Sequence, residues 1–263
     1  MAAWEFPRKV AAPGEVEFAF VPGLFARALP RIFAEARNSL HAEGLSNHLL
    51  AAGLADSADR AVRRIQALAA RRPQARWIWL THSKGGLHAL TALAEDAHLR
   101  ARTAGVVLVQ CPAGSSKVLD SVLIGRHRET ASRLTRVKER LQSGLLRTVG
   151  ARTGCLEITE SGLAALTRRA TARLFDFPVL SVATWSVRPT SWLDSYHRRL
   201  SEIAPEVAHD GQFLLPDQLW PRYEQIFLPE LDHAQPVLGG FGFDPGRFWL
   251  TLAELVVARL RNH

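Results

Sequence analysis

The stretch Trp77-Ile78-Trp79-Leu80-Thr81-His82-Ser83-Lys84-Gly85-Gly86-Leu87-His88 decides the fold of this chain. Its apolar run, residues 77–80, predicts a short buried strand, and residues 87–94 continue at helical spacing. A strand, a sharp turn and a helix with a serine at the apex form a nucleophile elbow, which lifts the serine hydroxyl clear of the sheet. The alternative interpretation of Ser83 is the N-cap of an ordinary helix.

Small residues are needed beside the serine of an elbow, because strand and helix nearly touch there. Gly85 and Gly86 meet this need on the helix side. On the strand side the pattern G-x-S-x-G has a glycine where this chain has Thr81, which is a departure from the pattern. The unpaired N–H groups at the start of such a helix can stabilise an oxyanion that forms on a substrate.

The length of 263 residues and the hydrophobic fraction of 47% are typical of a globular protein with one α/β core. No apolar run approaches the roughly 18 residues that cross a bilayer. Residues 1–8 lack the charged-then-apolar layout of a signal peptide, so we expect a cytoplasmic chain. Cys111 and Cys155 have no ligand-spaced partners, which predicts free thiols and no zinc site.

The net charge of +8 is unevenly distributed along the chain. Residues 113–177 contain twelve Lys and Arg against six Asp and Glu, so this quarter of the chain carries +6. A solvated helical face is the simplest interpretation, and an anionic substrate, an acidic carrier or a lipid surface is the alternative. Because no aromatic residues are interleaved with the basic ones, we expect no nucleic-acid partner.

Predicted strands and helices alternate along the first part of the chain, which predicts a doubly wound, mostly parallel sheet. In such sheets, sites collect beyond the carboxyl ends of the strands. Gly23 and Ser83 both follow predicted strands directly, so they are expected at the same edge. The predicted strands are residues 16–21, 45–50, 77–80 and 105–109, and the predicted helices between them are residues 26–41, 57 to about 72, and 87–94.

The alternation lapses between residues 113 and 177, which we interpret as a helical cap or lid inserted into an α/β core formed by residues 1–112 and 178–263. One amphipathic helix is predicted here from apolar residues three and four apart, and a second covers about residues 162–174. The apolar residues of the first helix are Leu134, Val137, Leu141 and Leu145. Downstream, the sequence predicts strands at residues 178–183 and 225–228, an irregular stretch at residues 185–208, and a closing helix at residues 244–261.

A serine hydroxyl is a weak nucleophile until a base accepts its proton, and a third group must orient that base. In this type of sheet the base follows the last strand and the acid follows the strand before it. His233 follows the predicted last strand, and Asp210 lies downstream of the predicted strand at residues 178–183. The chain order Ser83, Asp210, His233 therefore predicts a catalytic triad.

Two carboxylates compete with Asp210 for the acid role. Asp232 is adjacent to the base in sequence, where side chains normally diverge, but Asp217 remains an open alternative. His233 has the alternative interpretation of a surface loop histidine. His82, beside the nucleophile, is expected to be a packing residue.

An oxyanion hole needs two N–H donors. The residue after the nucleophile, Lys84, is expected to supply one through its backbone. The loop after the strand at residues 16–21 is expected to supply the other, best placed at Leu24. Because both donors belong to the main chain, their side chains are free to vary.

Three further stretches match motifs of a known family. Val21-Pro22-Gly23-Leu24 is similar to a His-Gly-x oxyanion loop, with Pro22 in place of His. Residues 111–115, Cys-Pro-Ala-Gly-Ser, are similar to a Pro-x-x-Gly-Ser segment that leads into a lid. Asp210-Gly211 is similar to an Asn-Asp-Gly motif that carries the triad acid, with His209 in place of Asn. On these residues the chain resembles the α/β-hydrolases, and within them the lipases and esterases.

The resemblance implies a serine hydrolase that cleaves a small-molecule carboxylic ester or thioester, with the residues of the predicted triad and oxyanion hole in the roles given above. Calcium-binding members carry an aspartate two residues after the histidine, where this chain has Gln235, so no metal and no other cofactor is expected. The apolar face of the cap helix predicts a hydrophobic acyl chain.

Two other functions stay open. A thioesterase or acyltransferase would act on an acyl chain bound to coenzyme A or to an acidic carrier, which the basic cap would contact. A non-catalytic binding module with the same fold is favoured by the three departures from the motifs, at Pro22, Thr81 and His209.

Overall fold

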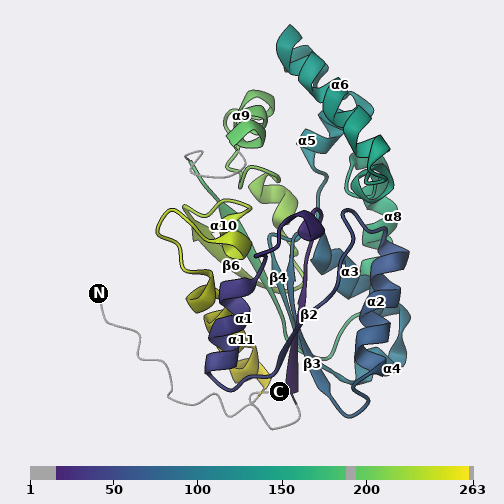
Figure 1. Ribbon diagram of the computed structural model, residues 1–263, viewed down its shortest axis with the longest axis vertical. Helices are drawn as coiled ribbons and strands as arrows, with labels where there is room; N and C mark the ends of the chain where they lie inside the picture. The colour runs from purple at the N-terminus through teal and green to yellow at the C-terminus, as the bar shows by residue number, and fades with distance from the viewer. Residues whose placement is uncertain (1–15, 188–193, 261–263) are drawn as a thin grey trace.

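The computed structural model describes residues 16–187 and 194–260, and these contain a six-stranded sheet in which every neighbouring pair of strands is parallel (Figure 1). The predicted α/β fold with a doubly wound sheet is therefore confirmed, and the sheet is wholly parallel within the described ranges. The strands are β1 (Val16–Val21), β2 (Asn47–Leu49), β3 (Arg76–His82), β4 (Thr103–Val109), β5 (Val179–Trp185) and β6 (Glu224–Pro229).

The strand order β2-β1-β3-β4-β5-β6 places the topological switch point between β1 and β3. The chain first winds from β1 to β2 and then returns past β1 to β3. The loops that follow β1 and β3 therefore leave the sheet beside each other, and a crevice between them is where α/β sheets bind ligands. Gly23 and Ser83 stand in these two loops, as the sequence predicts.

Helices cover both faces of the sheet (Figure 1). α1 (Ala34–Ala42) and α11 (Pro245–Leu260) lie on one face, and α2 (Ala58–Ala70), α3 (Lys84–Glu95) and α8 (Glu160–Ala170) lie on the other. Because successive strand residues point to opposite faces, Phe18 and Phe20 of β1 enter the first core and Ala19 enters the second. All seven residues of β4 are buried, as expected for a strand covered on both sides.

The segment between β4 and β5 is helical, but its last helix is part of the α/β layer. α8 packs along α3 and supplies Leu163 and Leu166 to the core on that face. The division of the chain at residues 112 and 177 stays a prediction. The other helical elements of the segment are α5 (Lys117–Leu119), a π-helical turn (Asp120–Ile124), a 3-10 turn (Arg128–Thr130), α6 (Arg133–Thr148) and α7 (Arg152–Leu156).

Two expectations about helices are wrong. Residues 26–41 form a short 3-10 turn (Ala26–Ala28) and the later α1 instead of one helix, and residues 185–208 contain α9 (Asp194–Ile203). The N-terminal residues 1–8, which lack the layout of a signal peptide, lie outside the described residues. Across residues 16–187 and 194–260, no helix is long and apolar enough to cross a membrane. The remaining elements are α4 (Ala97–Ala101), α10 (Gln235–Leu238) and a 3-10 helix (Leu215–Gln218).

Acid is expected to destabilise the fold through His88, which lies in the fully buried part of α3. Burial, together with the nearby Lys84 ammonium, holds the pKa of His88 well below its usual value. Below about pH 6.5, the imidazole of His88 therefore binds a proton in the unfolded chain but not in the folded chain. The free energy of unfolding falls as the pH drops through this range.

The variant His88→Leu is expected to flatten this acid dependence. Between about pH 7.5 and about pH 5.5, the loss in the free energy of unfolding should shrink by about 1.4 kcal/mol relative to the wild type, as measured by urea titration. The control His98→Leu removes an exposed histidine and should leave the loss unchanged. If the free energy of unfolding fell equally with pH in His88→Leu and in the wild type, a neutral, buried His88 would be contradicted.

Candidate active site

Ser83 stands at the apex of a sharp turn between β3 and α3. Its backbone has φ 54° and ψ −136°, a region that non-glycine residues rarely occupy and that costs about 1–3 kcal/mol. Its side chain accepts no capping hydrogen bond from α3. The interpretation of Ser83 as an ordinary N-cap is therefore wrong, and the strained turn has the geometry of a nucleophile elbow.

Small residues after Ser83 allow the start of α3 to lie close to β1 and to the loop after β4. A Cβ atom on Gly85 would lie 2.2 Å from the carbonyl oxygen of Val21, and one on Gly86 would lie 2.4 Å from Sγ of Cys111. Thr81, the departure from the elbow pattern, is accommodated because its Oγ1 donates a hydrogen bond of 2.8 Å to the carbonyl oxygen of Val107 in β4.

Gly23 brings the loop after β1 against Ser83. A Cβ atom on Gly23 would lie 2.8 Å from Cβ and 3.2 Å from Oγ of Ser83. The variant Gly23→Ala is therefore expected to displace the serine hydroxyl and to lower kcat/KM, for a reaction in which that hydroxyl attacks, by about 100-fold. The control Gly144→Ala adds a methyl group where no atom lies within 4 Å and should leave kcat/KM unchanged. Equal kcat/KM in the two variants would contradict the close approach.

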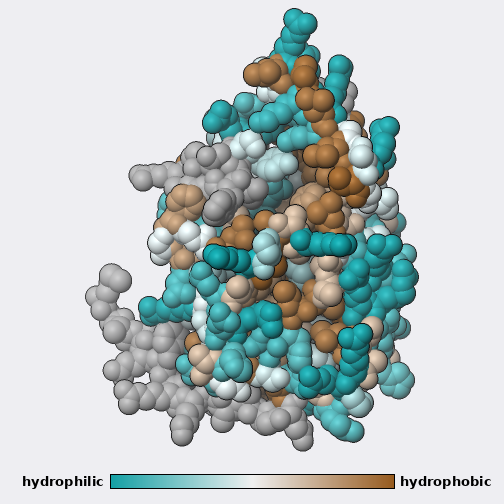
Figure 2. Space-filling model, in the orientation of Figure 1, coloured by the Kyte–Doolittle hydropathy of each residue, from teal (hydrophilic) through white to brown (hydrophobic). Residues whose placement is uncertain are grey.

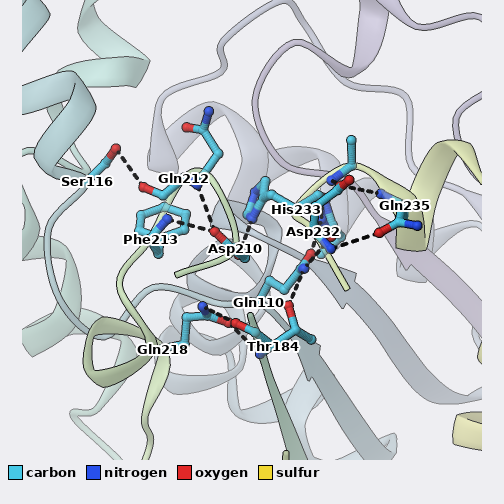
Figure 3. Close-up of polar contacts among 12 residues, drawn as sticks. Gln110, Ser116, Thr184, Asp210, Gln212, Phe213, Gln218, Asp232, His233 and Gln235 are labelled. Carbon is cyan, nitrogen blue, oxygen red and sulfur yellow. Dashed lines mark hydrogen bonds and ion pairs between the residues drawn. The ribbon is translucent and has the colours of Figure 1, made fainter. Parts of the chain in front are cut away.

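His233 and Asp210 meet as the sequence predicts. Nδ1 of His233 lies 2.7 Å from Oδ2 of Asp210, and the backbone N–H of His233 donates to the carbonyl oxygen of Asp210 (Figure 3). The other oxygen, Oδ1, accepts hydrogen bonds of 2.8 Å from the backbone N–H groups of Gln212 and Phe213. The carboxylate is thus fully buried with hydrogen bonds to both of its oxygens, and it fixes the imidazole ring.

The two competing aspartates lie in other contacts. The side chain of Asp217 faces Gly114, whose added Cβ would lie 1.8 Å from Oδ1 of the aspartate. Oδ1 of Asp232 accepts hydrogen bonds from the backbone N–H groups of Ala234 and Gln235 at the start of α10. Burial raises the pKa of both carboxyl groups. Asp210 is thus the aspartate that contacts His233.

His82 and Gln110 form a buried support under the histidine loop (Figure 3 shows Gln110). Nε2 of His82 lies 2.9 Å from both Oε1 of Gln110 and the carbonyl oxygen of His233, so this nitrogen carries the proton. The amide of Gln110 donates to the carbonyl oxygen of Asp232 and to Oγ1 of Thr184. Burial and the neighbouring His233 lower the pKa of His82 to about 3, so it stays neutral.

The backbone N–H groups of Leu24 and Lys84, the expected oxyanion donors, make no hydrogen bond among the described residues. Lys84 directly follows Ser83, and Leu24 directly follows the glycine that touches Ser83. Two free donors beside a nucleophile are what an oxyanion hole requires.

The side chain of Lys84 has contacts that the sequence does not predict. It is fully buried, and its Nζ donates to the carbonyl oxygens of Asp56 and Gly154 and to Oε2 of Glu157, at 2.9, 2.7 and 2.6 Å. Burial lowers the pKa of this ammonium group, and the Glu157 carboxylate opposes that shift. Lys84 therefore links the turn at Ser83 to the loop before α2 and to the end of α7.

Ser83 and His233 line the same cavity, of about 280 Å³. Among the described residues no hydrogen bond joins the serine hydroxyl to the imidazole, and such bonds commonly tighten only when substrate binds. The walls are mostly apolar, and Tyr196 of α9, which lies in the stretch expected to be irregular, is one of the few polar groups. The apolar lining comes from Leu24, Phe25, Leu29, Ile32, Leu119, Ile158, Phe213, Ala234, Val237 and Leu238.

The apolar face of α6 does not shape this cavity, contrary to the expectation from its pattern. Leu134, Leu141 and Leu145 are exposed, and none of them lines the cavity. Glu139, the buried residue of α6, is held by polar contacts with Ser121 and Arg199, and the partly buried Leu146 packs against the core. From residues 113–177 only Leu119 and Ile158 reach the cavity wall.

Comparisons with known proteins agree with this architecture. The chain is similar to the crystal structure of a metagenomic carboxyl esterase, with 22% identity, a TM-score of 0.72, and coverage of 93% of this chain and 76% of the other. It is also similar to a Bacillus licheniformis lipase in its mature form, with 13% identity, a TM-score of 0.63 and 93% coverage of both chains. No family model matches the sequence, and no curated protein matches it.

These likenesses, together with the parallel sheet and the strained turn at Ser83, show that the chain has the α/β-hydrolase fold. The resemblance inferred from the sequence is confirmed at this level.

Proposed function

We propose that the protein is a serine hydrolase that cleaves carboxylic esters with an apolar acyl group. The observation that supports this most strongly is the 2.7 Å contact between Asp210 and His233 at the wall of an apolar cavity that Ser83 also lines. The likeness in fold to a carboxyl esterase and a lipase is consistent with the same chemistry.

In the first half of the proposed reaction, Oγ of Ser83 attacks the acyl carbon while its proton passes to Nε2 of His233. Asp210 accepts a hydrogen bond from Nδ1 of the imidazole, which leaves Nε2 free to act as the base. The carbonyl electron pair moves to the oxygen, where the N–H groups of Leu24 and Lys84 stabilise the negative charge. When the tetrahedral adduct collapses, the alcohol leaves with the proton from His233, and an acyl-serine ester remains.

In the second half, a water molecule attacks the acyl carbon and gives a proton to His233. The second adduct collapses, the proton passes to Oγ of Ser83, and the carboxylic acid is released. No other reactant is consumed, so the proposed cycle returns the serine hydroxyl and the neutral imidazole.

The cavity lining supports an apolar acyl group as the bound part of the substrate. Leu29, Ile32, Val237 and Leu238 provide aliphatic walls, whereas few polar side chains reach the cavity. A pocket of this kind favours a chain that leaves water, since each buried methylene contributes about 0.8 kcal/mol. The proposal therefore predicts that kcat/KM rises along a series of saturated acyl groups until the cavity is filled.

A panel of nitrophenyl esters from acetate to laurate, with acyl-coenzyme A thioesters of the same lengths, tests the proposal. We expect the esters to be hydrolysed, with longer chains preferred to acetate and with Ser83→Ala inactive. Faster turnover of acetate than of any longer ester would contradict the apolar acyl group.

Preference for the thioesters would favour a thioesterase instead. If the basic face of α6 recruits an acidic carrier, turnover of a carrier-bound thioester should fall steeply between low and high ionic strength, because salt screens exposed charges. Hydrolysis of nitrophenyl esters should not depend on salt in this way, since these substrates carry no net charge.

A further inference from the structure

α6 exposes its apolar side to solvent. The exposed fractions are 78% for Leu134, 49% for Val137, 70% for Leu141 and 62% for Leu145, and Val149, directly after the helix, is 45% exposed. We call these five residues the α6 stripe. They recur three and four apart and therefore lie along one side of the helix. Figure 2 shows apolar residues gathered along the projecting part of the molecule that α6 occupies in Figure 1.

Buried polar contacts, together with the partly buried Leu146, hold the opposite side of α6 against the protein. Glu139 is buried, and its Oε1 accepts hydrogen bonds of 2.6 Å from Oγ of Ser121 and 3.0 Å from Nε of Arg199. Arg199 also donates to Oγ1 of Thr130 and to the carbonyl oxygen of His127. Because this buried network anchors the inward side, the α6 stripe cannot turn inward without breaking the buried pair between Glu139 and Arg199.

The exposed charges on α6 are all basic. Arg133, Arg136, Arg140, Arg147 and Lys138 are exposed, whereas Glu139, the only acid of the helix, is buried. Arg133, Arg140 and Arg147 recur every seven residues and so form a row beside the α6 stripe. None of these basic side chains forms an ion pair with another described residue.

The apolar α6 stripe and the basic row beside it together favour a partner that is negatively charged and can also bury apolar side chains. A helix with leucines on one side and arginines beside them is the pattern of a helix that lies in the plane of a bilayer, with its apolar side in the acyl boundary. A second copy of the chain would bring an identical basic row against this one, and like charges would repel. Negatively charged headgroups would complement the row, at about 1 kcal/mol for each basic residue near the surface.

We propose that α6 is a membrane-docking helix, which lies on bilayers that contain anionic lipids. The leucines of the α6 stripe enter the boundary between headgroups and acyl chains, and the arginine row contacts the headgroup phosphates. This docking depends on α6 alone and does not rest on the proposed hydrolase activity.

Co-sedimentation of the full chain with lipid vesicles tests the proposal. We expect binding to vesicles of phosphatidylcholine mixed with phosphatidylglycerol to exceed binding to phosphatidylcholine vesicles by about tenfold or more, and to weaken at high salt. Ser83→Ala should bind as the wild type does. A wild type that binds neither kind of vesicle, or both equally, would overturn the proposal.

Matched variants locate the binding surface. Leu141→Glu with Leu145→Glu, and separately the triple reversal Arg133→Glu, Arg136→Glu and Arg140→Glu, should each lower binding to the mixed vesicles by about tenfold or more. The control triple Arg31→Glu, Arg63→Glu and Arg71→Glu changes the net charge equally at exposed arginines outside α6 and should retain binding. Equal losses in both triples would assign binding to net charge and overturn the proposal. If the wild type bound no vesicles but formed a dimer that dissociated in Leu141→Glu, the α6 stripe would be the contact surface for a second copy, and the proposal would be overturned.

Discussion

The variant Ser83→Ala is expected to lower kcat for the best nitrophenyl ester by about 10⁶-fold, because no other group can form the acyl-enzyme. The hydroxyl is well placed for attack by the strained backbone of the elbow, at φ 54°. Initial rates with excess enzyme measure the residual activity, and circular dichroism checks that the fold is retained.

The control Ser143→Ala removes a hydroxyl from α6, outside the cavity, and should change kcat by less than about twofold. If Ser83→Ala kept more than about one hundredth of wild-type kcat, Ser83 would not be the attacking group.

The variant Glu157→Gln is expected to destabilise the protein by about 3 kcal/mol. It removes the carboxylate that faces the fully buried Lys84 ammonium at 2.6 Å, and so leaves a buried charge without a counter-ion. The amide retains an oxygen that can accept the hydrogen bond from the backbone N–H of Ala58, which limits the change to the charge itself. Urea unfolding at neutral pH measures the loss.

A control and a double variant separate the buried pair from charge removal in general. Glu95→Gln removes an acid from an exposed pair with Arg169 and should cost less than about 1 kcal/mol. Lys84→Met should be less destabilising in the Glu157→Gln background than in the wild type, because the partner charge is already absent. Additive losses in the double variant would show that the two side chains do not interact.

Much of the fold could be predicted because its signals are local. The apolar run before Ser83 and the glycines after it lie within ten residues, so one short stretch predicts the strand, the turn and the helix. The neighbouring strand β4 contains a continuous apolar run, residues 105–109, as is typical of a strand covered on both faces. Helix α9 was not predicted because its apolar signal is short: Tyr196, Leu200 and Ile203 stand four and three apart, but the other residues of the helix are polar.

The site could be predicted in part. Chain order narrowed the acid to Asp210 or Asp217, and only the folded chain brings Asp210 within 2.7 Å of His233. The supports under the histidine loop were missed because His82 lies 151 residues from His233, whose carbonyl oxygen it contacts. No local pattern reports such a contact.

The direction that α6 faces could not be read from its pattern either. The spacing of its leucines correctly predicts an amphipathic helix, but an amphipathic helix normally turns its apolar side inward. Here the buried contact between Glu139 and Arg199, 60 residues apart, fixes the opposite orientation. This contact explains why the apolar side of α6 does not face inward as predicted, and it leaves the α6 stripe exposed for the proposed docking to lipid.

Labelling with a fluorophosphonate tests most directly whether Ser83 is an activated nucleophile. Intact-mass measurement of the wild type should show one phosphonyl adduct, Ser83→Ala should show none, and His233→Ala should react far more slowly, because the imidazole no longer accepts the serine proton. A wild type that takes up no label, or a Ser83→Ala variant that is labelled as fast as the wild type, would contradict the account.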